Sequence, residues 1–262
     1  MKSVLTIAGS DSSGGAGIQA DLKTITAHNI YGTSVITALT AQNTLGVTGI
    51  MEVAPDFVAK QLDCVFTDIF PNSVKIGMVS NTEIIEVICD KLIEYKVQNI
   101  VVDPVMVSTS GSKLISDEAL EVLVNKLLPL GLIITPNIPE AEILSNISIK
   151  NQDDMIKAAE IISKNLSCGI LIKGGHLVNE ATDLLFEKGK ISWFTSPRIE
   201  TTNTHGTGCT LSSAIACNLA KGLSIYDSIE ASKNYLTSAL AYGLDLGQGS
   251  GPVNHMFILD KL

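Results

Sequence analysis

The sequence predicts an α/β fold in which a central, mostly parallel β-sheet carries helices on both faces. Short apolar, β-branched runs alternate along the chain with longer segments of helical periodicity. Polar residues and glycines follow directly after these apolar runs, at the carboxyl ends of strands where ligands bind in open α/β sheets. No linker, repeat or low-complexity segment interrupts the chain, so we expect one domain spanning residues 1–262.

The first predicted strand covers residues 4–8, and a glycine-rich loop leads from it to a helix at 18–28. Residues 15–20 match the dinucleotide fingerprint G-x-G-x-x-A. The next strand, 34–40, ends in Ala-Gln-Asn and supplies no acid to hold a ribose, which argues against a dinucleotide site. We expect these glycines instead to let the backbone approach a flat, uncharged substrate.

The remaining elements continue the alternation. Two short strands at 183–186 and 191–194 are expected to pair as an antiparallel hairpin at one edge of the sheet. The strand at 99–102 is almost continuously apolar, which is typical of strands buried on both faces. Further strands are predicted at 47–53, 73–77, 132–134 and 169–173, and helices at 56–68, 82–95, 117–128, 153–164, 207–220 and 224–242.

Composition excludes several classes of function. A formal charge of −9 and a pI near 4.9 argue against a nucleic-acid or anionic-membrane surface built on bulk charge. No apolar stretch approaches the ~18 residues of a membrane span. Five scattered cysteines form no Cys-x-x-Cys pair and favour a reducing compartment, so we expect a cytoplasmic protein.

A glycine turn at residues 203–208 leads into the helix predicted at 207–220. Such a helix start directs unpaired N–H groups and the positive end of the helix dipole at one point, which suits a phosphate. Cys209 lies in the same turn, where we expect the dipole to favour a thiolate. The alternative interpretation is structural: Thr207 caps the helix, and Cys209 is a small buried residue in its first turn.

Polar residues at the predicted strand ends should converge on one edge of the sheet. Two carboxyl groups, an amide and a lysine at that edge would suit Mg²⁺ and a polyphosphate, although no G-x-x-x-x-G-K-[ST] motif is present. Structural alternatives exist here as well, since Asp103 could be a turn residue and Asn137 with Glu140 a capping box. His176 and His205 are interpreted as hydrogen-bonding loop residues. The strand-end residues are Gly9, Gln42, Gly77, Met78, Asp103, Asn137, Glu140 and Lys173.

Three motifs together resemble the ribokinase superfamily. They are the Gly-Thr-Gly-Cys turn at 206–209, the N-x-x-E stretch at 137–140 and the opening segment 8–21. Within that superfamily, the chain resembles the hydroxymethylpyrimidine/phosphomethylpyrimidine kinases of thiamine biosynthesis, from about residue 4 to residue 253. The resemblance implies a ribokinase-like fold and ATP-dependent phosphorylation of 4-amino-5-hydroxymethyl-2-methylpyrimidine and then of its monophosphate.

The resemblance also implies roles for individual residues. The anion hole and base would be Gly206, Thr207, Gly208 and Cys209. ATP would be bound by Lys173, Asn137, Asp103 and Thr207, and Mg²⁺ by Glu140 and Asp103. The pyrimidine would lie near Gly9, Asp21, Gln42, Met78 and Val105. Many sugar kinases of the superfamily carry Asp where this chain has Cys209, and a thiol is a weaker base unless its pKa is lowered.

Two other functions remain open at this stage. Pyridoxal kinase, a close relative, has a similar Gly-x-Gly-Cys turn, although residues 37–44 look more like the pyrimidine kinases. A non-catalytic pyrimidine-binding regulator could use the same fold, but it would not need a base, an anion hole and a lysine together. The expected partners are ATP and the pyrimidine alcohol with its phosphate, and we expect a homodimer.

Overall fold

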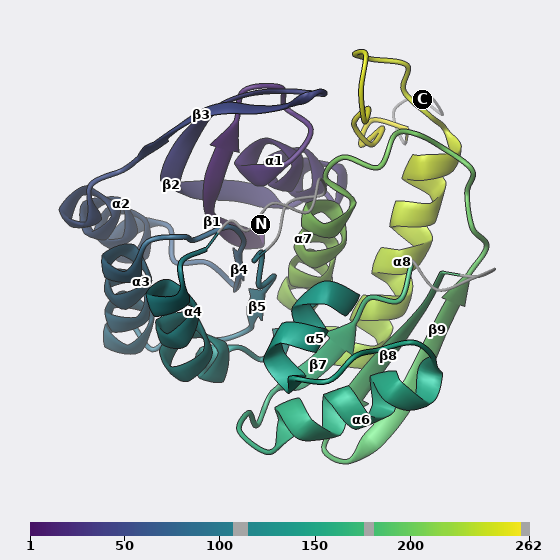
Figure 1. Cartoon of the computed structure of the whole chain (residues 1–262). Coiled ribbons are helices and arrows are strands. Elements are labelled where there is room, and N and C mark those ends of the chain that lie inside the picture. The colour runs from purple at the N-terminus through teal and green to yellow at the C-terminus, as the bar shows by residue number, and fades with distance from the viewer. Residues whose placement is uncertain (107–114, 176–180, 258–262) are drawn as a thin grey trace.

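The computed structural model describes residues 1–106, 115–175 and 181–257 (Figure 1). Its strands are β1 (Ser3–Asp11), β2 (Tyr31–Asn43), β3 (Gly46–Glu52), β4 (Ser73–Ile76), β5 (Ile100–Val102), β6 (Ile133–Ile134), β7 (Gly169–Ile172), β8 (Ala181–Glu187) and β9 (Lys190–Ser196). Its helices are α1 (Gly17–Ala27), α2 (Pro55–Asp68), α3 (Thr82–Glu94), α4 (Asp117–Val122), α5 (Ile138–Ser145), α6 (Gln152–Ser163), α7 (Thr207–Ala220) and α8 (Ile225–Ala241). A π-helical turn (Leu123–Leu127) and a 3-10 turn (Leu128–Leu130) continue α4.

The strands of the described residues form one sheet in the order β3-β2-β1-β4-β5-β6-β7-β8-β9. From β2 to β7 every neighbouring pair is parallel, whereas β3 at one end and β8 and β9 at the other pair antiparallel. The predicted mostly parallel sheet with an antiparallel edge is therefore confirmed. Because the central strands are parallel, their carboxyl ends share one edge.

Helices cover both faces of the sheet, and alternate strand residues belong to different cores. On β5, Val102 packs in the cluster that contains α2, α3, α4 and α6, whereas Val101 packs against α7 and α8. Both valines are 0% exposed. This two-sided burial explains why the strand is apolar without alternation.

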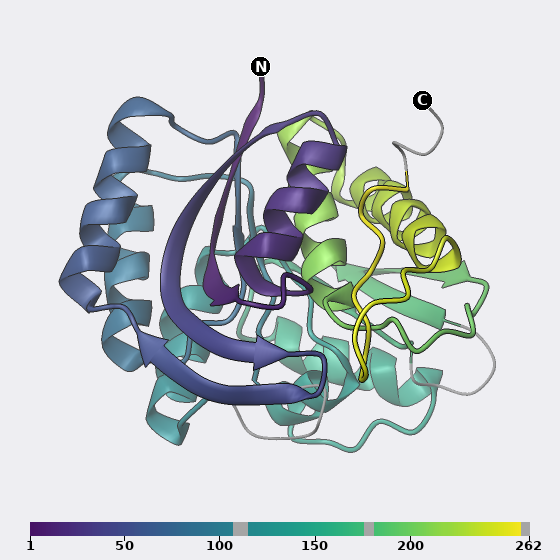
Figure 2. The same cartoon turned by 90° about the horizontal axis from the view of Figure 1, so that it is seen from above.

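Two elements differ from the prediction. Residues 46–52 form a strand as expected, but β3 runs antiparallel to β2 and all seven of its residues are exposed, so the sheet has a second antiparallel edge. The tip of this hairpin lies beside the C-terminal loop (Figure 2), where the hydroxyl of Thr44 accepts hydrogen bonds from the N–H groups of Gln248 and Gly249. The second difference is α5, a short helix in a segment that the sequence pattern did not assign as helical.

Candidate active site

The carboxyl ends of β5, β6 and β7 bring three of the predicted residues together. Asn137 pairs with Lys173 in an isolated parallel bridge, and the Lys173 N–H donates to the carbonyl of Pro136 at 2.8 Å. The Lys173 Nζ then donates to Asp103 Oδ1 at 2.8 Å. The geometry that strand-end reasoning predicted is thus present for Asp103, Asn137 and Lys173.

Asp103 and Lys173 form an ion pair at the rim of this edge. The Asp103 side chain is 3% exposed and that of Lys173 is 16% exposed. Burial acts to raise the pKa of Asp103, but Lys173 and Lys75 outweigh it and hold the pKa below its usual range. Burial likewise acts to lower the pKa of Lys173, but Asp103 and Glu140 outweigh it and raise the pKa. Both groups are therefore charged at neutral pH.

Glu140 and Asn137 form a complete capping box at the start of α5, so the structural alternative for this pair is also realised. Asn137 accepts from the Glu140 N–H at 2.9 Å, and Glu140 Oε2 accepts from the Asn137 N–H at 2.8 Å. Glu140 is 2% exposed, and burial raises its pKa to about 7 although Lys173 opposes the shift. A buried carboxylate with a raised pKa is held at a free-energy cost that an added cation would offset.

The donor set of this edge fits Mg²⁺ better than a transition metal. The available atoms are the carboxylate oxygens of Glu140 and Asp103, which are hard ligands. One of the two Asp103 oxygens, Oδ1, already accepts a hydrogen bond from Lys173. Among the described residues no group of three His, Cys, Asp or Glu side chains could hold a metal ion. Mg²⁺ typically uses only one or two protein carboxylates and takes its other ligands from phosphates and water. The residues therefore suit an ion that arrives with a nucleotide.

The start of α7 reaches the same edge. Gly206 has φ 81°, and a Cβ there would lie 1.8 Å from the carbonyl oxygen of Gly15, so only glycine fits between the two loops. A Cβ on Gly208 would lie 3.4 Å from Lys173 Nζ and 3.5 Å from Asp103 Oδ2. The first turn of α7 thus begins beside the lysine, where the Thr207 N–H donates to the carbonyl of Thr204 at 3.3 Å.

Cys209 lies within range of several charged groups. Its sulfur accepts from the N–H of Gly17, and the charges of Lys75, Asp21 and Asp103 act on it. Burial raises the pKa of the Cys209 thiol to about 11, with Lys75 opposing the shift. The expectation of a lowered pKa is therefore wrong, because desolvation outweighs the dipole of α7 and the nearby lysine.

Three of the predicted substrate residues lie around the ends of β1, β4 and β5. A Cβ on Gly9 would meet the Met78 methyl group at 3.0 Å. Thr37 of β2 donates to the Met78 carbonyl at 3.2 Å, and the Val105 N–H donates to the carbonyl of Asp103 at 2.8 Å. Gln42 lies on β2, where its side chain approaches His205 at 3.4 Å.

Asp21 is turned inward. Its side chain is 0% exposed, and its oxygens accept from Lys75 at 2.8 Å, Thr6 at 2.6 Å and Ser213 at 2.7 Å. Direct contact between Asp21 and a substrate has no support in this geometry, because internal donors occupy the carboxylate. Sequence reasoning missed Lys75, although a lysine inside the apolar strand β4 requires a buried partner and so indicates one.

His205 is a hydrogen-bonding loop residue, as expected, and it connects two loops. Its Nε2 lies 2.8 Å from Asp11 Oδ2, and its N–H donates to the carbonyl of Gly251 at 3.0 Å. The expectation for His176 falls outside the described residues. His205 directly precedes the glycine turn, so its contacts also help to place Gly206.

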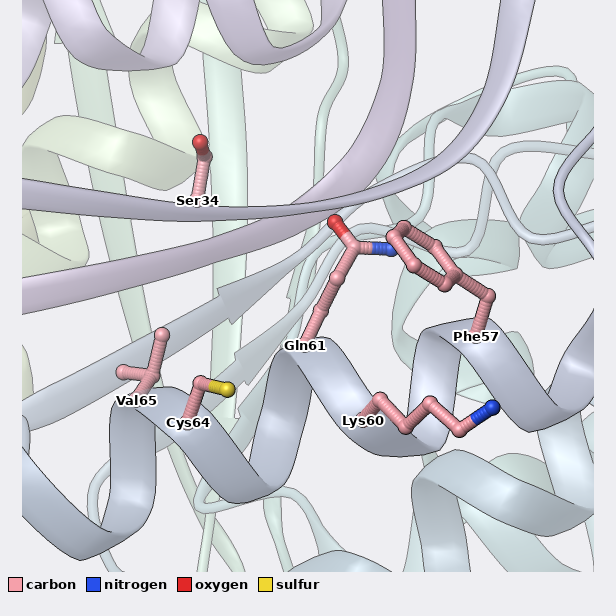
Figure 3. A pocket seen from close by; sticks show the side chains of 6 residues that line it. All are labelled: Ser34, Phe57, Lys60, Gln61, Cys64 and Val65. Carbon is pink, nitrogen blue, oxygen red and sulfur yellow. The ribbon is translucent and has the colours of Figure 1, made fainter.

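A hollow of about 290 Å³ lies elsewhere, between α2 and β2 (Figure 3). Figure 3 shows the side chains of α2 on one side of it and Ser34 of β2 on the other. None of the predicted site residues lines this hollow, so it plays no part in the strand-end cluster. Its lining residues are Ser34, Phe57, Lys60, Gln61, Cys64 and Val65.

Comparisons with known proteins point to one family of kinases. Residues 11–254 match the family model described as phosphomethylpyrimidine kinase. The chain is 49% identical over 255 residues to hydroxymethylpyrimidine/phosphomethylpyrimidine kinase of Rhizobium meliloti, covering 96% of each chain. It is 51% identical over 261 residues to a thiamine biosynthesis bifunctional protein of Geobacter sulfurreducens. That match covers 99% of this chain but only 53% of the Geobacter protein.

Among solved structures, the pyridoxal kinase of Staphylococcus aureus in complex with AMP-PCP and pyridoxal superimposes with a TM-score of 0.90. It is 33% identical and covers 97% of this chain and 93% of its own. The shared fold therefore extends to a kinase that binds an ATP analogue. Within the described residues, no helix has the length and apolar character needed to cross a bilayer.

Proposed function

The chain belongs to the phosphomethylpyrimidine kinase family, and from that premise we propose that it phosphorylates 4-amino-5-hydroxymethyl-2-methylpyrimidine and then the resulting monophosphate, using ATP, in thiamine biosynthesis. The observation that carries this proposal is the position of Gly208 beside Lys173 and Asp103, with Cys209 as the next residue. A cation, a set of backbone donors and a proton acceptor thus meet at one point.

Each group of site residues has a separate role in the proposed reaction. The Cys209 thiolate accepts the proton of the substrate hydroxymethyl group as its oxygen bonds to the γ-phosphorus, and the bond from that phosphorus to ADP breaks. The N–H groups of Gly206, Thr207 and Gly208 stabilise the negative charge that develops on the phosphoryl oxygens. Lys173 leaves its ion pair with Asp103 and instead pairs with the phosphates of ATP, whose negative charge it neutralises.

Glu140 and Asp103 would hold Mg²⁺, with Asn137 and Thr207 near the nucleotide phosphates. When bound, the ion supplies charge neutralisation of the β- and γ-phosphates. Support comes from Glu140, because burial raises its pKa to about 7 and a bound cation would offset the cost of ionising it. The pyrimidine would lie against Gly9, Met78 and Val105, with Gln42 at its polar edge.

Turnover with a panel of alcohols tests this function. We expect ADP release in the presence of Mg²⁺ and hydroxymethylpyrimidine, with kcat/KM at least tenfold above that for pyridoxal. A higher kcat/KM for pyridoxal would instead assign a pyridoxal kinase, consistent with the pyridoxal complex of the structural neighbour. Tight binding of the pyrimidine without any ADP production would assign a regulator.

The base assignment has its own test. Because the pKa of the Cys209 thiol is about 11, the thiolate fraction rises with pH, and we expect kcat to increase steadily from pH 7 to pH 9. Cys209→Ala should lower kcat by about 10²-fold and abolish this increase, while substrate affinity stays near that of the parent. Near-normal turnover in the variant would leave the start of α7 as an anion hole without a base.

Three further properties are proposed with the function. The chain would fold as a single domain, act in the cytoplasm and form a homodimer. Five free cysteines support a reducing compartment, and exposed Leu45, Ile50 and Met51 around β3 offer apolar surface for a second copy. Light scattering of the purified chain tests the dimer, since a monomer mass would contradict it.

A further inference from the structure

Asp183 on β8 connects the end of strand β7 to helix α8. Its Oδ2 accepts from the Nζ of Lys233 on α8 at 2.6 Å, and its Oδ1 accepts from the N–H of Gly174 at 2.9 Å. Both charged side chains are buried, with 7% of Asp183 and 8% of Lys233 exposed. Because apolar residues of similar volume often stabilise a fold as well as a buried ion pair does, stability alone does not account for this pair.

Gly174 directly follows Lys173, at the point where β7 ends. A Cβ on Gly174 would collide with the carbonyl oxygen of Thr182, so β8 approaches the backbone closely here. The backbone ladder between β7 and β8 ends one residue before Lys173. The Gly174 N–H is therefore held by the Asp183 side chain and not by the ladder.

The two peptide groups that flank the Lys173 Cα are both held. The Lys173 N–H donates to the carbonyl of Pro136 at 2.8 Å, and the next N–H, that of Gly174, donates to Asp183. Because peptide groups are planar, fixing both of them fixes the direction of the Cα–Cβ bond between them. The lysine side chain is long and flexible, so the direction of this bond decides which positions its ammonium can reach. In the structure the ammonium lies 2.8 Å from Asp103 Oδ1, beside the start of α7.

Lys173 and Asp183 lie on the face of the sheet that α7 and α8 cover (Figure 1). Leu171 and Leu185 pair across β7 and β8, and both pack in the cluster that contains residues of α7 and α8. Side chains alternate along a strand, so Lys173 and Asp183, each two positions away from these leucines, are directed to the same face. There Lys173 meets the start of α7, and Asp183 meets α8.

We propose that Asp183 and its counterion Lys233 are positioning residues that direct the Lys173 ammonium toward the nucleotide phosphates. The inference rests on the proposed function, in which Lys173 pairs with the phosphates of ATP, and deepens it. The carboxylate holds the Gly174 N–H through one oxygen, and Lys233 holds the carboxylate through the other. Fixing the base of the lysine side chain in this way reduces the cost of ordering the ammonium when ATP binds.

A purely structural role is the alternative, in which the pair only attaches α8 to the sheet. The two roles differ in what they predict for nucleotide binding. A structural pair affects stability and leaves the position of the Lys173 ammonium unchanged. A positioning pair affects the affinity for a nucleoside triphosphate, and does so only while Lys173 is present.

Two double variants separate these roles. Asp183→Asn with Lys233→Met keeps a side-chain oxygen for the Gly174 N–H, whereas Asp183→Leu with Lys233→Met has a similar shape and no acceptor. Both remove the two charges of the pair together. We expect the Asp183→Leu double variant to bind AMP-PCP in the presence of Mg²⁺ about tenfold more weakly than the Asp183→Asn double variant in titration calorimetry. Its KM for ATP should rise by a similar factor, with kcat changed less than threefold.

The Lys173→Met background shows whether the effect acts through the lysine. When Lys173→Met is added to both double variants, we expect their affinities for AMP-PCP to differ less than twofold. Equal affinities of the two double variants in the presence of Lys173 would overturn the proposal, and so would a tenfold difference that persists without it. Where the Asp183→Leu double variant does not fold, as judged by circular dichroism, Asp183→Ala with Lys233→Met replaces it, because it also lacks the acceptor.

The matched control is a buried polar residue of the same helix. Ser232 of α8 is 0% exposed, and its hydroxyl donates to the Ser228 carbonyl at 2.6 Å. Ser232→Ala should lower the stability of the protein and leave its affinity for AMP-PCP within twofold of the parent. A tenfold loss of affinity in this control would show that any disturbance of α8 weakens nucleotide binding, which contradicts a specific role for Asp183.

Nucleotide binding and substrate turnover keep this proposal distinct from the proposed function. If the variants bind AMP-PCP as expected but the parent does not phosphorylate hydroxymethylpyrimidine, the positioning role is supported and the function is wrong. If the parent phosphorylates hydroxymethylpyrimidine but the two double variants bind AMP-PCP equally, the function is supported and the positioning role is wrong.

Discussion

Two lysine–aspartate pairs of equal length differ in the access of solvent to their lysines. Lys75 and Asp21 meet at 2.8 Å with both side chains 0% exposed, whereas Lys173 and Asp103 meet at 2.8 Å at the rim of the sheet, 16% and 3% exposed. Helix α7 contacts both pairs through adjacent residues, since Ser213 donates to Asp21 and Ser212 to Asp103.

The N–O distance of an ion pair therefore does not indicate whether the pair stabilises the fold or is available to a ligand. The inner pair has no route to another partner, because Asp21 is surrounded by protein donors, so it holds α1, β4 and α7 together. The rim pair lies against the first turn of α7, where we propose that a phosphate replaces the carboxylate. We therefore expect changes to the inner pair to act on stability and changes to the rim pair to act on activity.

The largest effect is expected at the inner pair. Lys75→Met leaves the Asp21 carboxylate buried without its counterion, and we expect the free energy of unfolding to fall by about 3–5 kcal/mol in urea denaturation. The matched control is Lys60→Met, which breaks an exposed pair with Asp56 and should leave the unfolding midpoint unchanged within error. Equal midpoints for the Lys75 and Lys60 variants would contradict the distinction.

The next effect is expected at the rim. Lys173→Met removes the cation beside the proposed anion hole, and we expect kcat/KM for ATP to fall about 10²-fold, in line with the loss of one preorganised charge stabiliser. Its loss of unfolding free energy should be smaller than that of Lys75→Met, because solvent reaches this pair. An active Lys173→Met protein with a large loss of stability would reverse the assignment of the two regions.

The smallest effect is expected at Glu140, which lies near the Lys173–Asp103 pair. The pKa of Glu140 is raised from 4.5 to about 7 by burial, so the folded state binds more protons between these values, and its stability falls as pH rises through that window. Glu140→Gln removes this dependence. We expect it to be more stable than the parent at pH 8 by about 2–3 kcal/mol, and similar to it near pH 4.5.

Urea denaturation in EDTA, without nucleotide, measures this difference between pH 4.5 and pH 8. If the free energies of unfolding of the parent and of Glu140→Gln changed equally with pH, the carboxyl group would be ionised at no free-energy cost in the folded state. The capping-box contact with the Asn137 N–H remains available to the glutamine oxygen, so loss of the cap does not confound the comparison.

Much of the fold could be predicted because a short, continuous apolar run is typical of a strand that is buried on both faces of a parallel sheet. The β5 strand is an example, since both of its faces are buried. The short helix α5 was harder to recognise, because its apolar residues are spread around the helix and define no single apolar face. Its start, residues 137–140, is equally consistent with polar ligands that follow a strand. The direction of β3 depends on its pairing with β2, which local pattern does not specify.

The sequence predicts the part of the site whose residues are brought together by the order of the strands. Asp103, Asn137 and Lys173 follow parallel strands, so their proximity follows from the order of the chain. The ionisation of Cys209 could not be predicted in the same way, because burial and the charges of Asp21, Asp103 and Lys75 depend on residues distant in sequence. For the same reason the sequence alone does not show that Lys75 binds the Asp21 carboxylate, which is therefore not available to a substrate.

The contact at the tip of the β2–β3 hairpin has a consequence for synthesis on the ribosome. Thr44 is held by Gly249, a residue 205 positions later in the chain. Translation proceeds from the N-terminus, so the hairpin that carries Gln42 emerges long before the segment that anchors it. We therefore expect nascent chains that end before this segment to contain an assembled sheet centre, while the edge that we propose to recognise the substrate is still unanchored.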